Sequence, residues 1–279
     1  DVYRCGFQSR YAGGQIVSLV GESGSGKYYC DPCGSRTLAG GGKVTRGDIL
    51  FNGKSLLKNT QEQWRNLRGS EISMIFQDSG AMMNPTRKIG AVFTEYLQTH
   101  EKISKKDAWA KGEEMLEKMR LPSPDNIMRS YPFQLSGGMR QRVMIAIAFA
   151  CDPKILICDE PTTALDVTIQ GQILDIIKNL QKKNQTSVIM ITHDLGVVAN
   201  IAQKIAVMYS GIIVESGTCE DIFYRPRHPY TWALIRSVPR LDLKNKQELA
   251  TIPGTPPDLF KPAGRMSVLH AVQLLYADL

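Results

Sequence analysis

The sequence predicts an α/β fold in which central parallel strands carry a phosphate-binding loop and polar side chains at their carboxyl ends. The short apolar run at 15–20 (QIVSLV) leads directly into a Gly-rich turn, as a buried strand would. Two near-continuous apolar runs, 154–160 (KILICDE) and 186–194 (TSVIMITHD), end in polar residues, and the segment 165–183 between them has helical periodicity. Such runs are typical of a β-α-β unit whose functional groups follow the strands.

Two further segments before residue 80 have strand patterns. Residues 47–57 (GDILFNGKSLL) alternate in polarity around Asn52 and Gly53. Asn-Gly is a frequent two-residue turn between antiparallel strands, so this stretch predicts a hairpin. Residues 71–77 (EISMIFQ) predict another strand.

The later part of the chain predicts helices, more strand and a Pro-rich end. Residues 92–130 are polar-rich and helical in pattern, with a break at Pro122 and Pro124. Residues 204–217 (KIAVMYSGIIVESG) alternate in polarity. The prolines between 225 and 262 predict an ordered, extended tail.

The composition is that of an ordinary globular protein. The 279 residues are 43% hydrophobic and 22% charged, with a formal net charge of +7. A positive charge can serve a nucleic acid, an anionic membrane surface or a phosphate ligand, or it can lie on a solvated face. The positive residues are scattered, and the densest cluster (EKISKKDAWAKGEE) mixes both signs. We therefore expect no nucleic-acid partner.

The chain contains no pattern of a membrane span or a signal peptide. Its longest apolar run, at 143–151, has nine residues, whereas a spanning helix needs about 18 or more. Reduced thiols in a cytoplasm are expected for the six cysteines. Cys30 and Cys33 form a single CxxC, which on its own indicates redox or metal chemistry only weakly.

The motif G-x-x-x-x-G-K is complete at residues 21–27, which we call the phosphate-binding loop. Its glycines let successive backbone N–H groups turn inward around phosphates, and a helix that follows adds its positive N-terminal end. Lys27 would reach the β- and γ-phosphates. The alternative is a chance Gly-rich turn, which the preceding strand disfavours. The predicted nucleotide-binding residues here are Gly21, Glu22, Ser23, Gly24, Ser25, Gly26 and Lys27.

Two acidic residues end the predicted strand at 155–161 (ILICDEP). Asp159 would hold Mg²⁺ through water, and Glu160 would polarise the water that attacks the phosphate. Taken alone, two acids at a strand end are more often a helix cap or an ion pair. His193 ends the next strand in ITHD, where it is placed to touch a γ-phosphate, although a lone histidine is usually structural.

The segment LSGGMRQR at 135–142 predicts a second anion site. Ser136 is a good N-cap, and Gly137 and Gly138 leave the backbone bare at the start of a helix. A plain capped helix would not need both glycines.

The order of these motifs resembles that of ABC-transporter ATP-binding subunits. GESGSGK, Gln77 in MIFQD, LSGGMRQR, ILICDEP, ALD (164–166) and ITHD follow one another as in that family. The resemblance implies an ATPase whose two subunits pair head to tail around two ATP molecules, so that Ser136 and Gly138 complete the site on the partner's loop. It also implies that Gln77, with Asp159, holds Mg²⁺ and couples the nucleotide to membrane subunits docked near residues 78–90. It further implies that Asp166 lies at the nucleotide.

The C-terminal third resembles the oligopeptide, dipeptide and nickel importers of this family. The stretches GIIVESGTCEDIFYRPRHPYTWALIRSVPRLD and IPGTPPDLFKPAG carry their HPYT and IPGxPP segments. The resemblance implies a peripheral protein at the cytoplasmic face of the inner membrane. Its partners would be a second ATP-binding subunit, two transmembrane permease subunits and an extracytoplasmic solute-binding protein.

Four regions follow from these motifs and this resemblance. Residues 1–91 form the phosphate-binding core with an antiparallel β part, and 92–150 form a helical subdomain that ends in LSGGMRQR. Residues 151–217 complete the core. Residues 218–279 form a C-terminal extension of the peptide-importer type.

Tyr28 interrupts the family pattern. The family has Ser after the loop lysine, which ligates Mg²⁺, followed by a helix of small and apolar residues, whereas this chain has YYCDPCGS. In a shifted reading frame, allowable codons for this stretch encode SITAIPVA. The end of the chain behaves alike: in a shifted frame GRMSVLHAVQLLYA becomes AGCPFCTRCNYCM, which resembles the family's cysteine-bearing ending. We interpret residues 28–35 and 265–279 as frameshifted.

Two other functions are open on the sequence alone. If Tyr28 is genuine, the chain is a nucleotide-binding subunit with impaired hydrolysis. A DNA-associated ABC ATPase is the other, but its long coiled coil is missing between Gln77 and Ser136.

Overall fold

A computed structural model of the chain describes residues 13–22, 25, 47–77, 79–163 and 165–237. The chain forms two compact units. Unit one consists of Asp1–Arg10, Ile16–Thr45 and Ile191–Leu279, and unit two of Tyr11–Gln15 and Arg46–Met190. The four regions expected from the sequence stay predictions.

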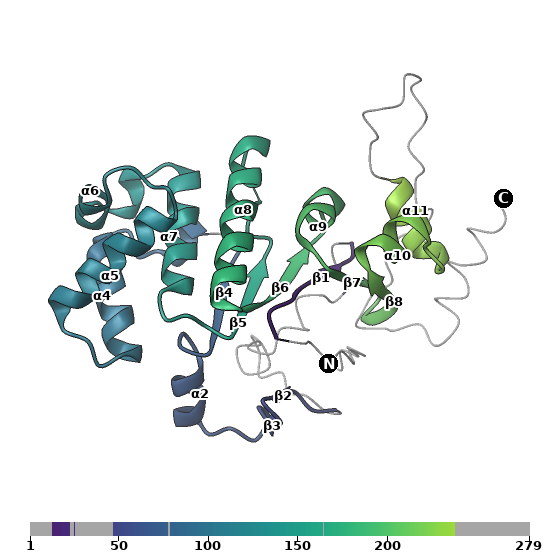
Figure 1. The fold of residues 1–279 in the computed structure, drawn as a ribbon, viewed down its shortest axis with the longest axis horizontal. Coiled ribbons are helices and arrows are strands. Elements are labelled where there is room, and N and C mark those ends of the chain that lie inside the picture. The colour runs from purple at the N-terminus through teal and green to yellow at the C-terminus, as the bar shows by residue number, and fades with distance from the viewer. Residues whose placement is uncertain (1–12, 23–24, 26–46, 78, 164, 238–279) are drawn as a thin grey trace. The chain divides into compact units, whose positions relative to one another are not determined.

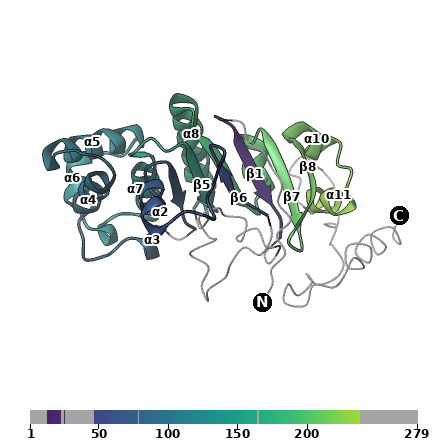
Figure 2. The ribbon, with the colours of Figure 1, turned by 90° about the horizontal axis from the view of Figure 1, so that it is seen from below.

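Unit one contains three neighbouring strands (Figure 2). β1 (Ile16–Val20) is parallel to β7 (Lys204–Tyr209), which is antiparallel to β8 (Ile212–Thr218). The first prediction of a strand, at 15–20, is confirmed. The alternating stretch 204–217 proves to be two strands joined at Ser210 and Gly211, which have φ of 49° and 77°. Such left-handed residues are what a tight turn between antiparallel strands requires.

Helices complete unit one, and they overturn part of the extended-tail prediction. These helices are α9 (Leu195–Ile201), α10 (Cys219–Tyr224) and α11 (Pro229–Arg236). The prediction is wrong for 229–236, where the chain is helical. Pro229 is the first residue of α11, where its fixed φ suits a helix and its missing N–H has no helical partner to lose. The rest of the predicted tail, from residue 238, lies outside the described residues.

Unit two contains the predicted β-α-β unit. β4 (Ile72–Ile75) and β5 (Ile155–Asp159) are parallel, with Ile75 opposite Cys158, and the first four residues of β6 (Ser187–Thr192) continue the order β4-β5-β6. Between β5 and β6 runs α8 (Val167–Asn184). Its buried side chains recur at helical spacing, which confirms the periodicity seen in the sequence: Ile173, Leu174, Ile176, Ile177, Leu180 and Gln181.

A group of helices confirms the helical prediction for 92–130 (Figure 1). It consists of α3 (Ser79–Met82), α4 (Ile89–His100), α5 (Lys105–Lys118), α6 (Pro124–Arg129), the 3₁₀ turn η2 (Pro132–Gln134) and α7 (Gly137–Phe149). Pro124 is again the first residue of its helix. Phe93, Leu116 and Met128 are fully buried among these helices. α7 packs against β4 and α8, so the LSGGMRQR helix is fixed to the strand-bearing part of unit two.

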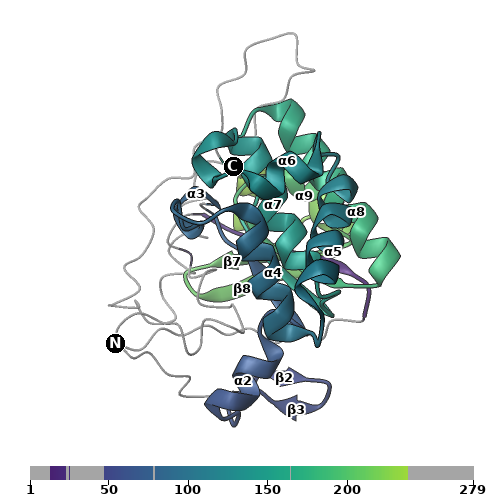
Figure 3. The same ribbon diagram turned by 90° about the vertical axis from the view of Figure 1, so that its left-hand side faces the viewer.

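The predicted hairpin is confirmed at the start of unit two. β2 (Leu50–Phe51) and β3 (Lys54–Ser55) are antiparallel, and Asn52 and Gly53 between them have φ of 50° and 76°. Figure 3 shows α2 (Gln61–Leu67) beside this hairpin. None of the described helices is both long and apolar enough to cross a membrane.

Candidate functional site

The described part of the phosphate-binding loop begins where β1 ends. Gly21 leaves no room for a side chain, because a Cβ there would lie 2.4 Å from the Met208 carbonyl oxygen and 2.8 Å from Ser25 Oγ. Ser25 N donates to the Glu22 carbonyl at 3.1 Å, and Gly211 N donates to the Ser25 carbonyl at 2.7 Å. The chain therefore turns tightly against the β7–β8 connection. The predicted residues Ser23, Gly24, Gly26 and Lys27, and also Tyr28, lie outside the described residues.

The loop residues that are described fit a phosphate group. The Ser25 side chain is 5% exposed, and its Oγ has no hydrogen-bond partner within the described residues. A buried hydroxyl without a partner costs free energy, and this one lies close to the end of β1. An anion that accepts a hydrogen bond would satisfy the Ser25 hydroxyl. Burial also raises the pKa of the Glu22 carboxyl next to it.

Glu160 lies at the carboxyl end of β5 and is held by two neighbours. Its Oε2 accepts from Gln77 Nε2 at 3.1 Å and from Thr163 Oγ1 at 3.1 Å, and the residue is 5% exposed. Because β4 and β5 are parallel and in register, the residues that follow them lie side by side. The structure thus brings together Gln77 and Glu160, two of the residues that the sequence analysis assigns to the nucleotide site. Asp159, half-buried, is the last residue of the strand.

The fit to Mg²⁺ rests on oxygen donors at this strand end. Gln77 and Asp159 carry the amide and carboxylate oxygens that Mg²⁺ accepts, usually together with waters and substrate phosphates. Within the described ranges, no three or more His, Cys, Asp and Glu side chains gather closely enough to hold a metal ion by themselves. A Mg²⁺ site here would therefore be completed by the phosphates.

Ser136 caps α7, as predicted. Its Oγ accepts from Met139 N at 3.3 Å. A Cβ built on Gly137 would meet nothing within 4 Å among the described atoms, whereas one on Gly138 would lie 3.0 Å from Ile169 Cγ2 in α8. Gly137 therefore presents bare backbone to the surroundings, and Gly138 allows close contact between two helices.

The segment after Glu160 is tied to α7 and α8. Gln141, a buried residue of α7, donates from Nε2 to the Pro161 carbonyl at 2.6 Å. Asp166 is the N-cap of α8 and accepts from Ile169 N at 2.9 Å. Its side chain thus has a structural partner, and its predicted role at the nucleotide stays a prediction.

His193 follows β6 in unit one. Its side chain is exposed, and the neighbouring Asp194 caps α9 by accepting from Gly196 N at 2.8 Å and Val197 N at 3.2 Å. Gly21, Ser25 and His193 belong to unit one, whereas Gln77, Ser136 and Glu160 belong to unit two. The contact of His193 with a γ-phosphate stays a prediction.

Sequence reasoning missed three residues that contact predicted residues or the motifs around them. Thr163 follows Glu160 by three positions, and Gln141 lies within LSGGMRQR, so a polar residue in or beside a motif was the available signal. The third, Tyr230 of the HPYT segment, contacts Glu22 from about 200 positions further along the chain. No local pattern could have connected these two.

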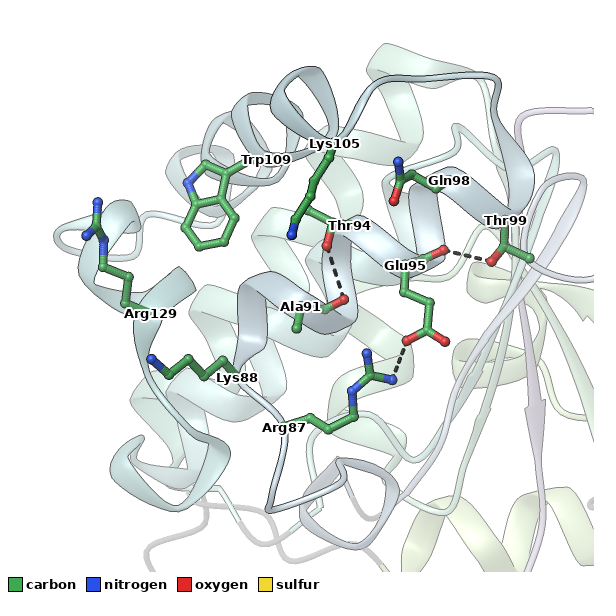
Figure 4. Close-up of a pocket in the computed structure, with 10 residues that line it drawn as sticks. All are labelled: Arg87, Lys88, Ala91, Thr94, Glu95, Gln98, Thr99, Lys105, Trp109 and Arg129. Carbon is green, nitrogen blue, oxygen red and sulfur yellow. Dashed lines mark hydrogen bonds and ion pairs between the residues drawn. The ribbon is translucent and has the colours of Figure 1, made fainter.

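A pocket of about 550 Å³ lies between α4, α5 and α6 (Figure 4). Its rim is mostly positive, with Arg87, Lys88, Lys105 and Arg129 against Glu95. Arg87 and Glu95 form an ion pair, and Trp109 contributes an aromatic wall.

Two family models match the chain. Residues 7–163 match a model described as ABC transporter, and residues 214–264 match one described as oligopeptide/dipeptide transporter, C-terminal region. The second match ends directly before the segment that we interpret as frameshifted.

Individual relatives and solved structures agree with these family models. The oligopeptide transport ATP-binding protein OppD of Bacillus subtilis is 54% identical over 250 residues, which cover 89% of this chain and 70% of that protein. The dipeptide transport ATP-binding protein DppD of Lactococcus lactis is 50% identical over 254 residues, covering 89% and 71%. The chain is also similar to a dimeric, post-hydrolysis ATP-binding cassette, MJ0796, bound to ADP and Pi. The TM-score is 0.66 and the identity 25%, over 76% of this chain and 88% of that one.

Proposed function

Because the chain belongs to the ABC transporter family, we propose that it is the ATP-binding and ATP-hydrolysing subunit of a membrane importer for oligopeptides or dipeptides. The observation that carries the catalytic part is the Glu160 carboxylate, buried at a strand end and held by Gln77 and Thr163. The peptide substrate rests on the relatives, which are oligopeptide and dipeptide transport proteins.

The proposed mechanism divides the work among these residues. Bound ATP supplies the phosphoanhydride bond, and Mg²⁺ supplies positive charge beside it. The backbone of residues 21–27 holds the phosphates, and Lys27 adds a positive charge. Gln77 and Asp159 provide oxygens toward the metal. Glu160 accepts a proton from the attacking water, which Gln77 and His193 help to orient.

The proposed partners follow from the same family. A second ATP-binding subunit would present its own signature helix, so that Ser136, Gly137 and Gly138 serve the partner's nucleotide. The permease subunits would contact residues 78–90 and the adjoining positive pocket around Arg87 and Lys88. A solute-binding protein would deliver the peptide from outside, and this chain would sit at the cytoplasmic face of the membrane.

The test is ATP hydrolysis by the full chain with its partner subunits in proteoliposomes, with residues 28–35 replaced by SITAIPVA. Glu160→Gln should lower the turnover number by about 10²–10⁴-fold, because the general base is lost, and should leave ATP binding intact. Glu114→Gln is the control, since Glu114 is an exposed acid of α5 paired with Lys118. Wild-type turnover in Glu160→Gln would contradict the catalytic assignment, and peptide-independent turnover without uptake would contradict the transport assignment.

A further inference from the structure

The helix α11 contacts the start of the phosphate-binding loop. Glu22 N donates to Tyr230 Oη at 3.3 Å, at the long end of the hydrogen-bond range. Both residues belong to unit one. Tyr230 is the tyrosine of the HPYT segment, so a signature of the C-terminal third reaches a loop more than 200 positions earlier.

Tyr230 is held firmly enough to position the loop. It is 3% exposed and belongs to a buried apolar cluster that includes Val20, the last residue of β1. Its ring lies against Tyr209, with ring centroids 4.6 Å apart. A buried aromatic packed on two sides has little rotational freedom. The hydroxyl is therefore presented to Glu22 by a rigid support.

The start of α11 is anchored as well. Glu215 of β8 accepts from Arg227 N at 2.8 Å with one carboxylate oxygen and from His228 N at 3.0 Å with the other. His228 Nδ1 in turn accepts from Tyr230 N at 3.2 Å and so caps the helix. The loop is thus held from two directions, by the β7–β8 connection at Gly211 and by α11 at Tyr230.

We propose that Tyr230 is a positioning residue for the phosphate-binding loop and that the HPYT segment serves the nucleotide site. The inference rests on the proposed function for its consequence, ATP binding, but its structural part is independent of nucleotide. The segment indicates the importer subfamily, yet its described contacts are with the loop and with the strands β1, β7 and β8. Losing the Tyr230 hydroxyl would release the Glu22 amide, so the loop would sample more conformations before it binds phosphate.

The variant that tests this is Tyr230→Phe in the full chain, with Thr231→Val as the matched control. Phenylalanine keeps the ring and removes only the hydroxyl. Thr231 is the next residue of the same helix, is 0% exposed, and has no hydrogen-bond partner for its Oγ1 among the described residues. Hydrogen exchange of the Glu22 amide, without nucleotide, is the primary measurement. Tyr230→Phe should accelerate it about threefold to tenfold, the size expected for one hydrogen bond, and Thr231→Val should leave it unchanged.

The amides of Ala206 and Val207 in β7 separate a local effect from a global one. If they accelerate as much as Glu22, the hydroxyl merely stabilises the unit, and the proposal is overturned. Unchanged exchange at Glu22 would overturn it too. In the chain carrying SITAIPVA, Tyr230→Phe should also raise the KM for ATP severalfold with little change in kcat. A chain that fails to hydrolyse ATP at all would count against the proposed function and not against the exchange result.

Discussion

Glu160 has a backbone conformation that few side chains adopt. Its φ is +43°, in the left-handed region that favours glycine. Such strain, about 1–3 kcal/mol, persists where the surrounding structure holds it, and it is frequent at active sites. Here the holding contacts come from Gln77 and Thr163. The sequence could predict Glu160 and Gln77, because each follows a strand-like run, but not the turn that brings Thr163 back.

Protonation of His228 should weaken the anchoring of α11. Burial lowers the pKa of His228, and the Glu215 carboxylate acts in the opposite direction. A lowered pKa means that the folded chain binds the proton less readily than the unfolded chain, so folded-state stability falls as pH decreases through about 6.5. His228→Asn keeps a capping oxygen without this titration.

We therefore expect the free energy of unfolding to decline less between pH 7 and pH 5 in His228→Asn than in the wild type. Denaturant titrations at four pH values would measure both slopes. The variant should still lose some free energy of unfolding as the pH falls, because burial also lowers the pKa of His100. Equal slopes for both chains would contradict the role of the His228 cap.

Strands were easier to predict than short helices. The strands β1, β4, β5 and β6 are buried apolar runs with distinct ends, which the sequence displays directly. The helices α10 and α11 follow the N-caps Thr218 and His228, whose capping contacts depend on Asp221 and on the backbone N–H of Tyr230. Pro229 suggested an extended chain because proline breaks a helix interior. It is compatible with a helix at the first position, which is where it lies in α11.

The connection after α2 should tolerate no side chain at Gly69. Its φ is +85°, and a Cβ would lie 2.3 Å from His100 Nε2. Gly69→Ala should lower the free energy of unfolding by about 1–3 kcal/mol. The control is Gly171→Ala in α8, where a Cβ meets no described atom within 4 Å. That change should raise the stability by about 0.5–1 kcal/mol, since alanine is the better helix former. Chemical denaturation measures both, and a stable Gly69→Ala chain would refute the close packing.

Two N-caps allow the proposed dimer to be tested at the level of the helix. Ser136 and Ser104 each cap a helix, α7 and α5, through the backbone N–H three residues on. Replacing either by arginine should cost about 1 kcal/mol of stability. Only Ser136→Arg should abolish ATP hydrolysis, because it would block the approach of a partner subunit, and the lone chain should still bind ATP. Equal hydrolysis by both variants would count against the head-to-tail arrangement.

At the scale of the whole chain, residues 28–35 and 265–279 depart from the pattern that the rest follows. Both lie outside the described residues. Residues 28–35 do not predict the helix that follows the loop in the family, and residues 265–279 lack the cysteines of the family's ending. The motif order was sufficient to predict the family because each motif is local. The division into two units was not predictable, since it depends on which distant segments contact one another.

Restoring the loop should raise ATPase activity in two steps. Tyr28 cannot place its hydroxyl where serine would ligate Mg²⁺, and losing one such contact costs about 10²–10³ in rate. Tyr28→Ser alone should recover part of the activity, and replacement of residues 28–35 by SITAIPVA should recover most of it. Mg²⁺-dependent hydrolysis of the three chains, each with its partner subunit, is the measurement. Equally high activity in all three chains would contradict both the expected impairment by Tyr28 and the frameshift interpretation.

The open space around Gly137 has a consequence for how this chain varies. Since a methyl group would fit there and alanine suits a helix better than glycine, folding alone gives no reason to keep glycine. In a saturation mutagenesis scored separately for cellular abundance and for growth on peptides, Gly137 substitutions should preserve abundance and abolish growth, whereas Gly69 substitutions should reduce both. Selection at Gly137 would then act on a contact between its backbone and another molecule. An assay that measures only the folding of the single chain would not detect it.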